Sequence, residues 1–414
     1  MTNLILLIIG AGLLFFSSFS KRLDETPLTA PMTFMLLGLG AHFAAPSLIE
    51  VEAEGHGFAL FAELTLGLIL FSDAARLKIA NLRRDYPLPA RMLLLALPLT
   101  ILGGGAIASA IFPELTIWQA FLVAAILAPT DAALGAAVMA SKAVPERLRE
   151  TINVESGLND GLALPAVLFT AALCAMGEGA EGPANGWVVF TLMQIGVGAA
   201  VGIGVGLAAG GLIVFTWKRR WLSSHYQNLS VIGLALLALA IPPFLGGNAF
   251  ISAYAAGLTF GAVSSNAPRF VDFAETEGNF FSLLIFFFFG AALAPMALEA
   301  FNWRIAVYAA LSLTAIRMVP IALSLIGAGL KARDVLFLGW FGPRGLASIL
   351  FLVIAIEARD AFDAPMVEHI IFLTVFASVI LHGASAKPFA MLFSTSKSGQ
   401  SGAASSDKSS SASA

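Results

Sequence analysis

The sequence predicts an all-α integral membrane protein with thirteen transmembrane helices, built as an inverted repeat of six helices with crossed, broken helices 5 and 12. Its composition is apolar, with 58% hydrophobic and 12% charged residues, against about 45–50% and 25% in soluble domains. Apolar runs recur along the whole chain. Five ionisable side chains lie inside these runs, where such residues mark ion or proton paths: Asp131, Glu155, Asp160, Arg317 and Arg344.

The apolar runs are long enough to cross a bilayer, which takes about 20 residues of helix. The predicted spans are 3–20, 29–47, 57–75, 88–112, 116–140, 148–176, 186–216, 226–244, 248–264, 279–298, 302–329, 334–358 and 367–392. A turn with two prolines and two glycines, within 242–247, divides the eighth span from the ninth.

Basic residues orient these spans. All but four of the 23 Lys and Arg residues lie in the loops after odd-numbered spans or at the C-terminal end. The exceptions are Arg304 and Arg359, near helix ends, and the intramembrane Arg317 and Arg344. Because positive loops stay in the cytoplasm, we expect an outside N-terminus, a cytoplasmic C-terminus and a multi-pass location in the cell (inner) membrane.

The chain divides into one membrane domain, 1–393, and a disordered, Ser-rich cytoplasmic tail, 394–414. The single cysteine, Cys174, excludes an internal disulfide and a Cys-based metal site. A net charge of −3 gives no indication of nucleic acid as a partner, and we expect no cofactor. The first apolar run has its basic residues after it, so it is predicted to be a membrane helix and not a signal peptide.

Spans 5 and 12 each carry a proline near mid-membrane with a charge close behind it, Pro129 with Asp131 and Pro343 with Arg344. Proline disrupts the preceding helical turn, so both helices are predicted to be broken. Asp131 suits the positive N-terminal end of the half-helix that follows it, and Arg344 suits a negative C-terminal end. Broken helices at matching positions of two halves indicate an inverted-repeat transporter with its site at the crossing.

Span 6 carries a polar sector formed by Glu155, Ser156, Asn159 and Asp160, which helical spacing places on one side. Oxygen ligands of this kind suit a hard cation. Arg317 in span 11 lies at a matching depth and is a plausible partner of Glu155. That pairing leaves Asp160 as the carboxylate that can hold a proton or a metal ion, but not both.

Together these motifs resemble those of sodium/proton exchangers of the NhaP/NHE type, in the cation:proton antiporter superfamily. The resemblance rests on Pro-Thr-Asp at 129–131, Glu-Ser-Gly-Leu-Asn-Asp at 155–160, Arg317 and Gly-Pro-Arg-Gly at 342–345. It implies thirteen helices, a homodimer, and an antiporter domain with a moving core and a static interface part. Relatives often have proline where this chain has Ala132.

The resemblance also implies roles for the site residues. Asp160 would bind the cation (Na+) and the proton in turn, and Ser156 and the Thr130 backbone would complete the cation shell. Asn159 would tie Glu155 to the broken helix of span 5.

The expected function is exchange of Na+, and also Li+, for H+ by alternating access, with a role in pH homeostasis. One exchanging carboxylate, with the Glu155 charge matched by Arg317, predicts electroneutral transport. A K+/H+ antiporter of the same fold, or a Na+-coupled organic-anion symporter, stays open as an alternative. The chain is not expected to be an enzyme, because no Ser/His or paired-Asp dyad is apparent. The remaining partner is the lipid bilayer.

Two weaker signals complete the analysis. Gly198, Gly202, Gly206 and Gly210 form a ridge of small residues, which we expect to serve close packing within the molecule. Asp73, at the inner end of span 3, is expected to lie at the membrane interface.

Overall fold

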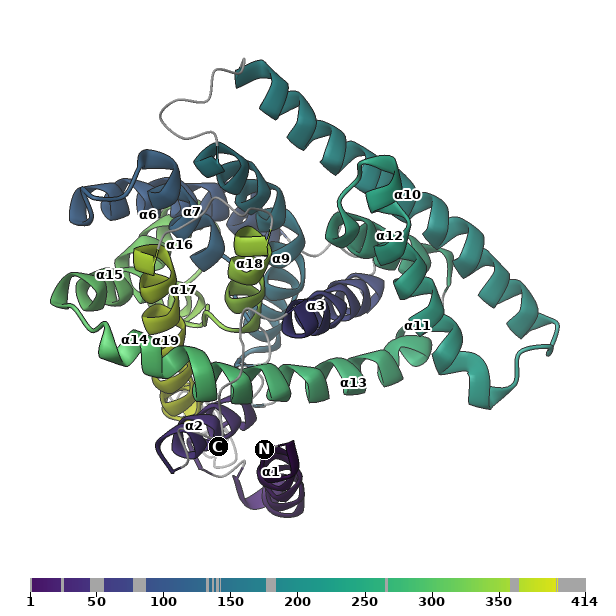
Figure 1. Ribbon diagram of the computed structural model, residues 1–414, viewed down its shortest axis with the longest axis horizontal. Helices are drawn as coiled ribbons and strands as arrows, with labels where there is room; N and C mark the ends of the chain where they lie inside the picture. Colours follow the sequence, from purple (N-terminus) through teal and green to yellow (C-terminus); the bar gives the residue numbers. More distant parts are fainter. Residues whose placement is uncertain are drawn as a thin grey trace, which may run out of the picture.

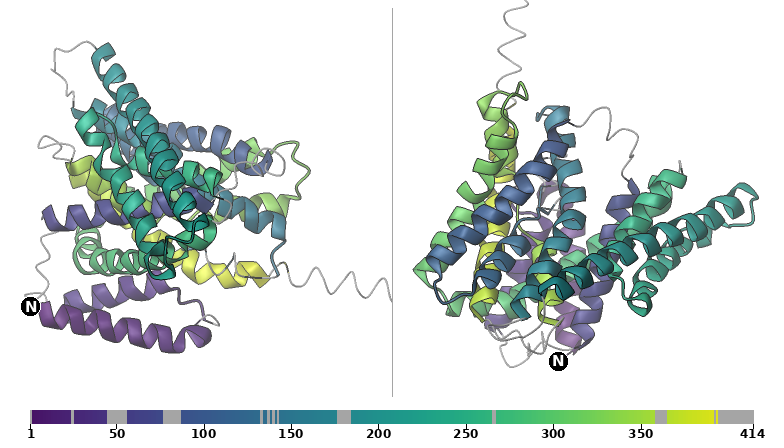
Figure 2. Two further views of the ribbon diagram at one scale, coloured as in Figure 1. Left: turned by 90° about the vertical axis from the view of Figure 1, so that its right-hand side faces the viewer. Right: turned by 90° about the horizontal axis from the view of Figure 1, so that it is seen from above.

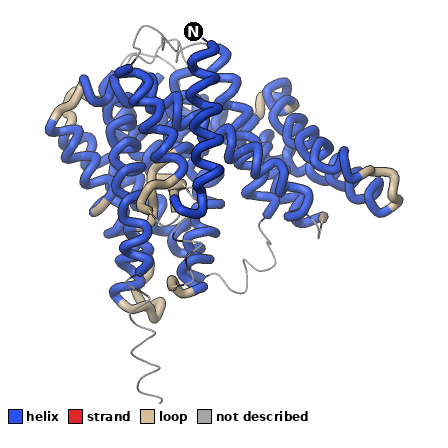
Figure 3. Tube along the Cα trace, turned by 90° about the horizontal axis from the view of Figure 1, so that it is seen from below, coloured by secondary structure: helices blue, strands red, loops and turns tan. Residues whose placement is uncertain are grey.

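The computed structural model describes residues 2–23, 26–44, 56–76, 87–131, 134–135, 138, 141, 143–175, 184–264, 267–357, 365–391 and 393. All regular structure in these ranges is helical (Figure 3). Helix is present within each of the thirteen predicted spans. The predicted tail and Ala132 lie outside the described residues.

The helices follow the chain in this order. They are α1 (Thr2–Leu23), α2 (Ala30–Ala44), α3 (His56–Arg76), α5 (Pro87–Arg91), η2 (Met92–Ala96), α6 (Leu97–Ile111), α7 (Ile117–Leu127), α9 (Glu146–Ala175), α10 (Ala184–Lys218), α11 (Ser224–Ala240), η4 (Pro242–Leu245), α12 (Ala249–Val263), α13 (Ala267–Phe288), η5 (Phe289–Leu293), α14 (Ala294–Glu299), α15 (Trp303–Leu313), α16 (Ala315–Ser324), α17 (Ala332–Trp340), α18 (Leu346–Glu357) and α19 (Pro365–Met391).

Many of these helices can cross a membrane. Within the described ranges, eight helical stretches are both long and apolar enough to do so, and four shorter apolar helices accompany them. The shorter ones include α7 and α18, each of which is one half of a span broken at a proline. The protein is therefore an all-helical, multi-pass membrane protein, and the count of thirteen spans stays a prediction.

The helices gather into two groups that meet along α9. Figure 1 shows α6, α7 and α15–α19 packed around α9 on one side, and α3, α10, α11 and α12 on the other. The long helix α13 runs past both groups and packs on α2 and α3. Figure 2 shows α10 and its neighbours extending away from the rest of the molecule. This division places the polar stretch of α9 close to the boundary between the groups.

The glycine ridge of α10 packs against α12. A Cβ atom added at Gly198, Gly202 or Gly206 would collide with backbone carbonyl oxygens of α12 or its N-cap residue, and one at Gly210 would meet the Phe260 ring. The prediction that this ridge serves packing within the molecule is confirmed. Small residues let the two backbones approach closely, which side chains of ordinary size would prevent.

Local sequence explains where several helices begin. Thr116 caps α7 through a capping box with Gln119, and the side chains of Asn248 and Asn302 cap α12 and α15. Each cap satisfies backbone N–H groups that a helix start leaves unpaired.

One predicted span is less regular than expected. The stretch 302–329 was predicted as a continuous helix, but it is divided at Thr314 into α15 and α16. The break places the end of α15 and the start of α16 next to the polar centre of the molecule, where carbonyl groups at a helix end can bind cationic side chains.

Candidate functional site

The two proline-containing breaks lie against each other. The first lies between the end of α7 at Leu127 and Asp131, and the second lies between α17 and α18. The Asp131 N–H donates to the Pro343 carbonyl oxygen over 2.8 Å, and the Leu346 N–H donates to Asp131 Oδ2 over 2.8 Å. The breaks of spans 5 and 12 therefore meet, as a crossing of broken helices requires.

The segment that follows Asp131, whose N-terminal end the sequence assigned to this charge, lies largely outside the described residues. Within them, the Asp131 carboxylate accepts a hydrogen bond from the Leu346 N–H at the start of α18. The reason is geometric: the Asp131 N–H binds Pro343, which sets its side chain opposite the N-terminus of α18. A negative charge stabilises that end of a helix. Gly345 makes room for this contact, because a Cβ there would overlap the Asp131 carboxylate.

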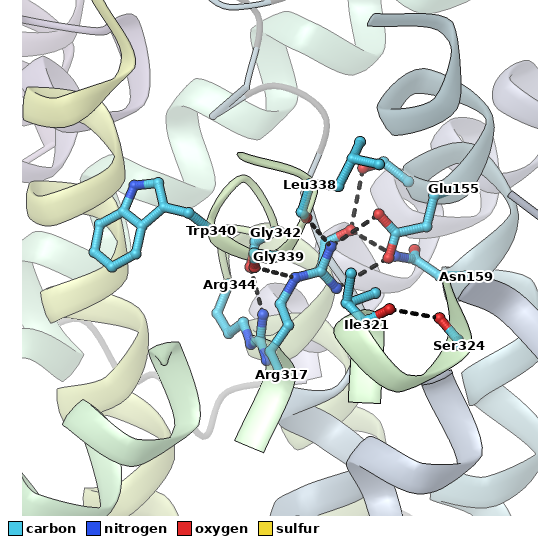
Figure 4. A network of polar contacts seen from close by, with 12 residues as sticks. Glu155, Asn159, Arg317, Ile321, Ser324, Leu338, Gly339, Trp340, Gly342 and Arg344 are labelled. Carbon is cyan, nitrogen blue, oxygen red and sulfur yellow. Dashed lines mark hydrogen bonds and ion pairs between the residues drawn. The ribbon is translucent and has the colours of Figure 1, made fainter. Parts of the chain in front are cut away.

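Glu155 and Arg317 form a bidentate ion pair inside the protein (Figure 4). Arg317 Nη1 and Nη2 donate to Glu155 Oε1 and Oε2, each over 2.9 Å. Both residues are buried: Glu155 is 4% exposed and Arg317 is 3% exposed. Two parallel bonds of this kind fix the geometry as well as matching the charges.

Arg317 also binds the end of α17. Its Nε donates to the Gly339 carbonyl oxygen over 3.1 Å, in the last turn of α17. A Cβ at Gly342 would overlap the Arg317 guanidinium group, so glycine is needed at that position. Arg317 thus joins α9, α16 and α17 at one point, which the sequence did not indicate.

Arg344 is fully buried and binds backbone oxygens. Its Nη1 donates to the Gly342 carbonyl oxygen, just beyond α17 (Figure 4). Its Nη2 donates to the Ser312 carbonyl oxygen in the last turn of α15 over 3.2 Å. Its backbone N–H donates to Ser378 Oγ of α19 over 2.6 Å. The positive charge of Arg344 therefore lies where α15 and α17 end, and it offsets the partial negative charge of these helix C-termini.

A second support for this break comes from α19. His382 Nδ1 lies 3.1 Å from Ser378 Oγ, and His382 Nε2 lies 3.0 Å from the Trp340 carbonyl oxygen. The Arg344 N–H can only donate to Ser378, and the Trp340 carbonyl can only accept. His382 Nδ1 also lies 3.1 Å from the Ser378 carbonyl oxygen, so this side chain links α19 to the end of α17. The sequence left this histidine without a role.

The polar sector of α9 faces the break of span 5. Thr130 Oγ1 and Ser156 Oγ lie 3.1 Å apart, and Asn159 Nδ2 donates to Thr130 Oγ1 over 2.6 Å. The sequence resemblance implied that Asn159 ties Glu155 to span 5. The structure shows the bond from Asn159 to span 5, at Thr130, whereas the described contacts of Glu155 are with Arg317. Glu155 thus binds Arg317 of α16, whereas Ser156 and Asn159 contact Thr130 in the break of span 5.

Asp160 is a buried carboxylate for which the described residues show no ion pair. It is 8% exposed, and its Oδ1 has no hydrogen-bond partner among the described residues. The side-chain amide oxygen of Asn159, Oδ1, is likewise buried and has no hydrogen-bond partner among the described residues. Orphaned oxygens of this kind, beside the hydroxyl groups of Ser156 and Thr130, fit a hard monovalent cation.

Further groups surround Asp160. Asp131, Glu155 and Asp73 lie near enough to interact electrostatically with it. Asp73 of α3, which we expected at the membrane interface, is among these acids. The sequence did not single out Tyr254 of α12, because an aromatic residue in an apolar run resembles any other core residue.

Comparison with known proteins identifies the family. Residues 6–392 match the family described as "Sodium/hydrogen exchanger, transmembrane". The chain belongs to this family, and the resemblance to NhaP/NHE-type exchangers is confirmed.

Individual relatives agree with this assignment. The chain is 26% identical to a Na(+)/H(+) antiporter of Schizosaccharomyces pombe, with 92% of this chain and 89% of that protein covered. It is 27% identical to the K(+)/H(+) antiporter NhaP of Alkalimonas amylolytica, covering 94% of this chain and 66% of that protein. The fold is similar to that of the sodium proton antiporter MjNhaP1 of Methanocaldococcus jannaschii, with a TM-score of 0.76 at 20% identity, covering 94% and 99% of the two chains.

Proposed function

We propose that the protein exchanges a monovalent cation, Na+ or Li+, for H+ across a membrane, with Asp160 as the exchanging carboxylate. The observation that carries the proposal is the contrast between two buried acids on α9. Glu155 is held by two bonds from Arg317, whereas Asp160 Oδ1 has no hydrogen-bond partner among the described residues. Family membership supports cation/proton exchange as the activity.

The chemistry of a single carboxylate explains the exchange. Ionised Asp160 attracts a cation, and the neighbouring oxygens of Ser156, Thr130 and Asn159 can replace its water shell. Protonated Asp160 is neutral and loses that attraction. Proton and cation therefore exclude each other, and alternating access of this one site to the two sides of the membrane couples their movements.

The matched charges of Glu155 and Arg317 support an electroneutral cycle. The pair carries no net charge, so the site carries one positive charge in each direction, a cation one way and a proton the other. A transmembrane voltage does not drive such a cycle. A strong dependence of exchange on membrane voltage would contradict this stoichiometry.

The arrangement of the chain is proposed on the same basis. Thirteen spans, with 1–6 and 8–13 as inverted halves, place the breaks of α7 and α17–α18 at equivalent positions, and they touch at Asp131 and Pro343. We also propose a cell-membrane domain over 1–393, an outside N-terminus, a cytoplasmic tail and a homodimer.

Potassium is the second candidate cation, because the relatives include proteins named as K(+)/H(+) antiporters. The oxygen ligands described here serve either ion. A Na+-coupled organic-anion symporter has less support, since Arg317 and Arg344 both bind acceptors of the protein itself.

The test is proton movement in proteoliposomes that contain a pH-sensitive dye, with Na+, Li+ and K+ added in turn. Wild type is compared with Asp160→Ala, and with Glu114→Gln as a control for the loss of an acid outside the site. We expect exchange with Na+ and Li+, none in the Asp160 variant, and wild-type exchange in the control. Exchange that persists in Asp160→Ala would overturn the assignment of the site.

A further inference from the structure

The α9 residue after Asp160 is in contact with an aromatic ring from the other helix group. A Cβ added at Gly161 would lie 2.8 Å from Tyr254 Cε2, and other atoms of the same ring lie 2.9 Å from it. Tyr254 belongs to α12, which lies on the opposite side of α9 from α7 and α17. The absence of a side chain at Gly161 is what lets the ring lie against the backbone beside the exchanging carboxylate.

The ring of Tyr254 is held by apolar neighbours. It packs against a small cluster of Leu93, Val154 and Leu158, two of which are on α9 itself. Its position is therefore set by packing that does not involve the hydroxyl group. Replacing the hydroxyl by hydrogen would keep this packing.

The hydroxyl group is buried and has no hydrogen-bond partner among the described residues. Asp160 Oδ1 is in the same condition. The two groups interact electrostatically, and Tyr254 also interacts with Asp73. Asp160 directly precedes Gly161, against which the Tyr254 ring lies. Buried oxygens without partners are costly to leave unsatisfied, and a cation that contacts both would satisfy both.

We propose that the Tyr254 hydroxyl oxygen is a further ligand of the cation at Asp160, supplied by α12 across the boundary between the two helix groups. This rests on the proposed function. A phenol oxygen is a neutral, hard acceptor, and it adds to the α9 and span 5 ligands without adding charge. The cation shell is then complete only while α9 and α12 are in contact, so relative movement of the two groups weakens binding and favours release.

The test compares Tyr254→Phe with Tyr308→Phe in proteoliposomes. Tyr308 is also buried, but its hydroxyl donates to the Gly104 carbonyl oxygen over 3.3 Å, so it controls for the loss of a buried hydroxyl. Loss of one bond between the Tyr254 hydroxyl and a charged group is expected to raise the apparent KM for Na+ about tenfold. We expect this rise for Tyr254→Phe with kcat largely retained, and no rise for Tyr308→Phe.

A second pair of variants tests the contact independently of the hydroxyl. Gly161→Ala displaces the ring, whereas Gly157→Ala, one turn earlier on α9, places its Cβ where no atom lies within 4 Å. We expect the KM for Na+ to rise in Gly161→Ala and to stay at the wild-type value in Gly157→Ala. The Na+-dependent rise in melting temperature of the purified protein in detergent should be smaller in Tyr254→Phe.

Several outcomes would overturn the inference. An unchanged KM in Tyr254→Phe, or an equal rise in Tyr308→Phe, would show that the Tyr254 hydroxyl is not a ligand. A changed pH dependence of exchange with an unchanged KM for Na+ would make the hydroxyl a hydrogen-bond donor to Asp160 instead. In all these cases wild type still exchanges cations through Asp160. The proposed function itself would be rejected by the absence of exchange in wild type, and its site by exchange that persists in Asp160→Ala.

Discussion

The pair formed by Glu155 and Arg317 gives the sharpest prediction about stability. Replacing Arg317 by Met removes both bonds to Glu155 and leaves a buried carboxylate without its cation. Breaking a buried ion pair in this way costs about 3–5 kcal/mol. The Gly339 carbonyl also loses its donor, which adds on the order of 1 kcal/mol. Arg317→Met is therefore expected to be strongly destabilised.

A second substitution separates the isolated charge from the loss of packing. Glu155→Gln in the Arg317→Met background removes the buried charge, so the double variant should be more stable than Arg317→Met alone. The coupling between the two sites should reach about 2–3 kcal/mol. Arg333→Met is the matched control, because Arg333 is largely exposed and its contact with Asp334 is 3.7 Å long. Such surface pairs contribute at most about 1 kcal/mol.

The assay is the free energy of unfolding in detergent micelles, from denaturant titrations of wild type, Arg317→Met, Glu155→Gln, the double variant and Arg333→Met under one set of conditions. The expected order of stability is wild type and Arg333→Met, then the double variant, then Arg317→Met. The reasoning is refuted if Arg317→Met is as stable as Arg333→Met. It is also refuted if adding Glu155→Gln to Arg317→Met lowers stability further.

Two other predictions concern the crossing of the broken helices and the loop between α6 and α7. Gly345→Ala should abolish most exchange, because its Cβ would displace the Asp131 carboxylate from the start of α18. Exchange is measured in dye-loaded proteoliposomes with Gly157→Ala as the control. Equal exchange by the two variants would contradict the prediction. Glu114, in the loop between α6 and α7, pairs over 2.7 Å with Arg304 in the first turn of α15, and the hydrogen bond from that guanidinium lowers the Glu114 pKa. The pair therefore stabilises the fold above the usual carboxyl pKa, and this contribution disappears as the pH falls through the lowered value. Glu114→Gln should lower the melting temperature slightly at about pH 7 and not at about pH 3; a loss of equal size at both would refute it.

The candidate site depends on both local and distant residues. The prolines at 129 and 343 break their helices through their own ring and missing N–H, so the sequence could locate both breaks. The contact of the Asp131 carboxylate with Leu346 could not be located in the same way, because Leu346 is 215 positions away. The break at Thr314 was missed for a related reason: no glycine or proline adjoins it, and the carbonyl of Ser312 there is bound by Arg344.

The sequence by itself determined the membrane class, the two proline breaks and the acids buried in span 6. These follow from run length, proline chemistry and the cost of charge in a bilayer, which act within a few residues of each other. Only the tertiary structure decided which other side chains meet: Asp131 binds Leu346, 215 positions away, and the Tyr254 ring lies against Gly161 from another helix group. Such contacts depend on how helices pack and which side chains are small enough to let them approach, and no local rule specifies that.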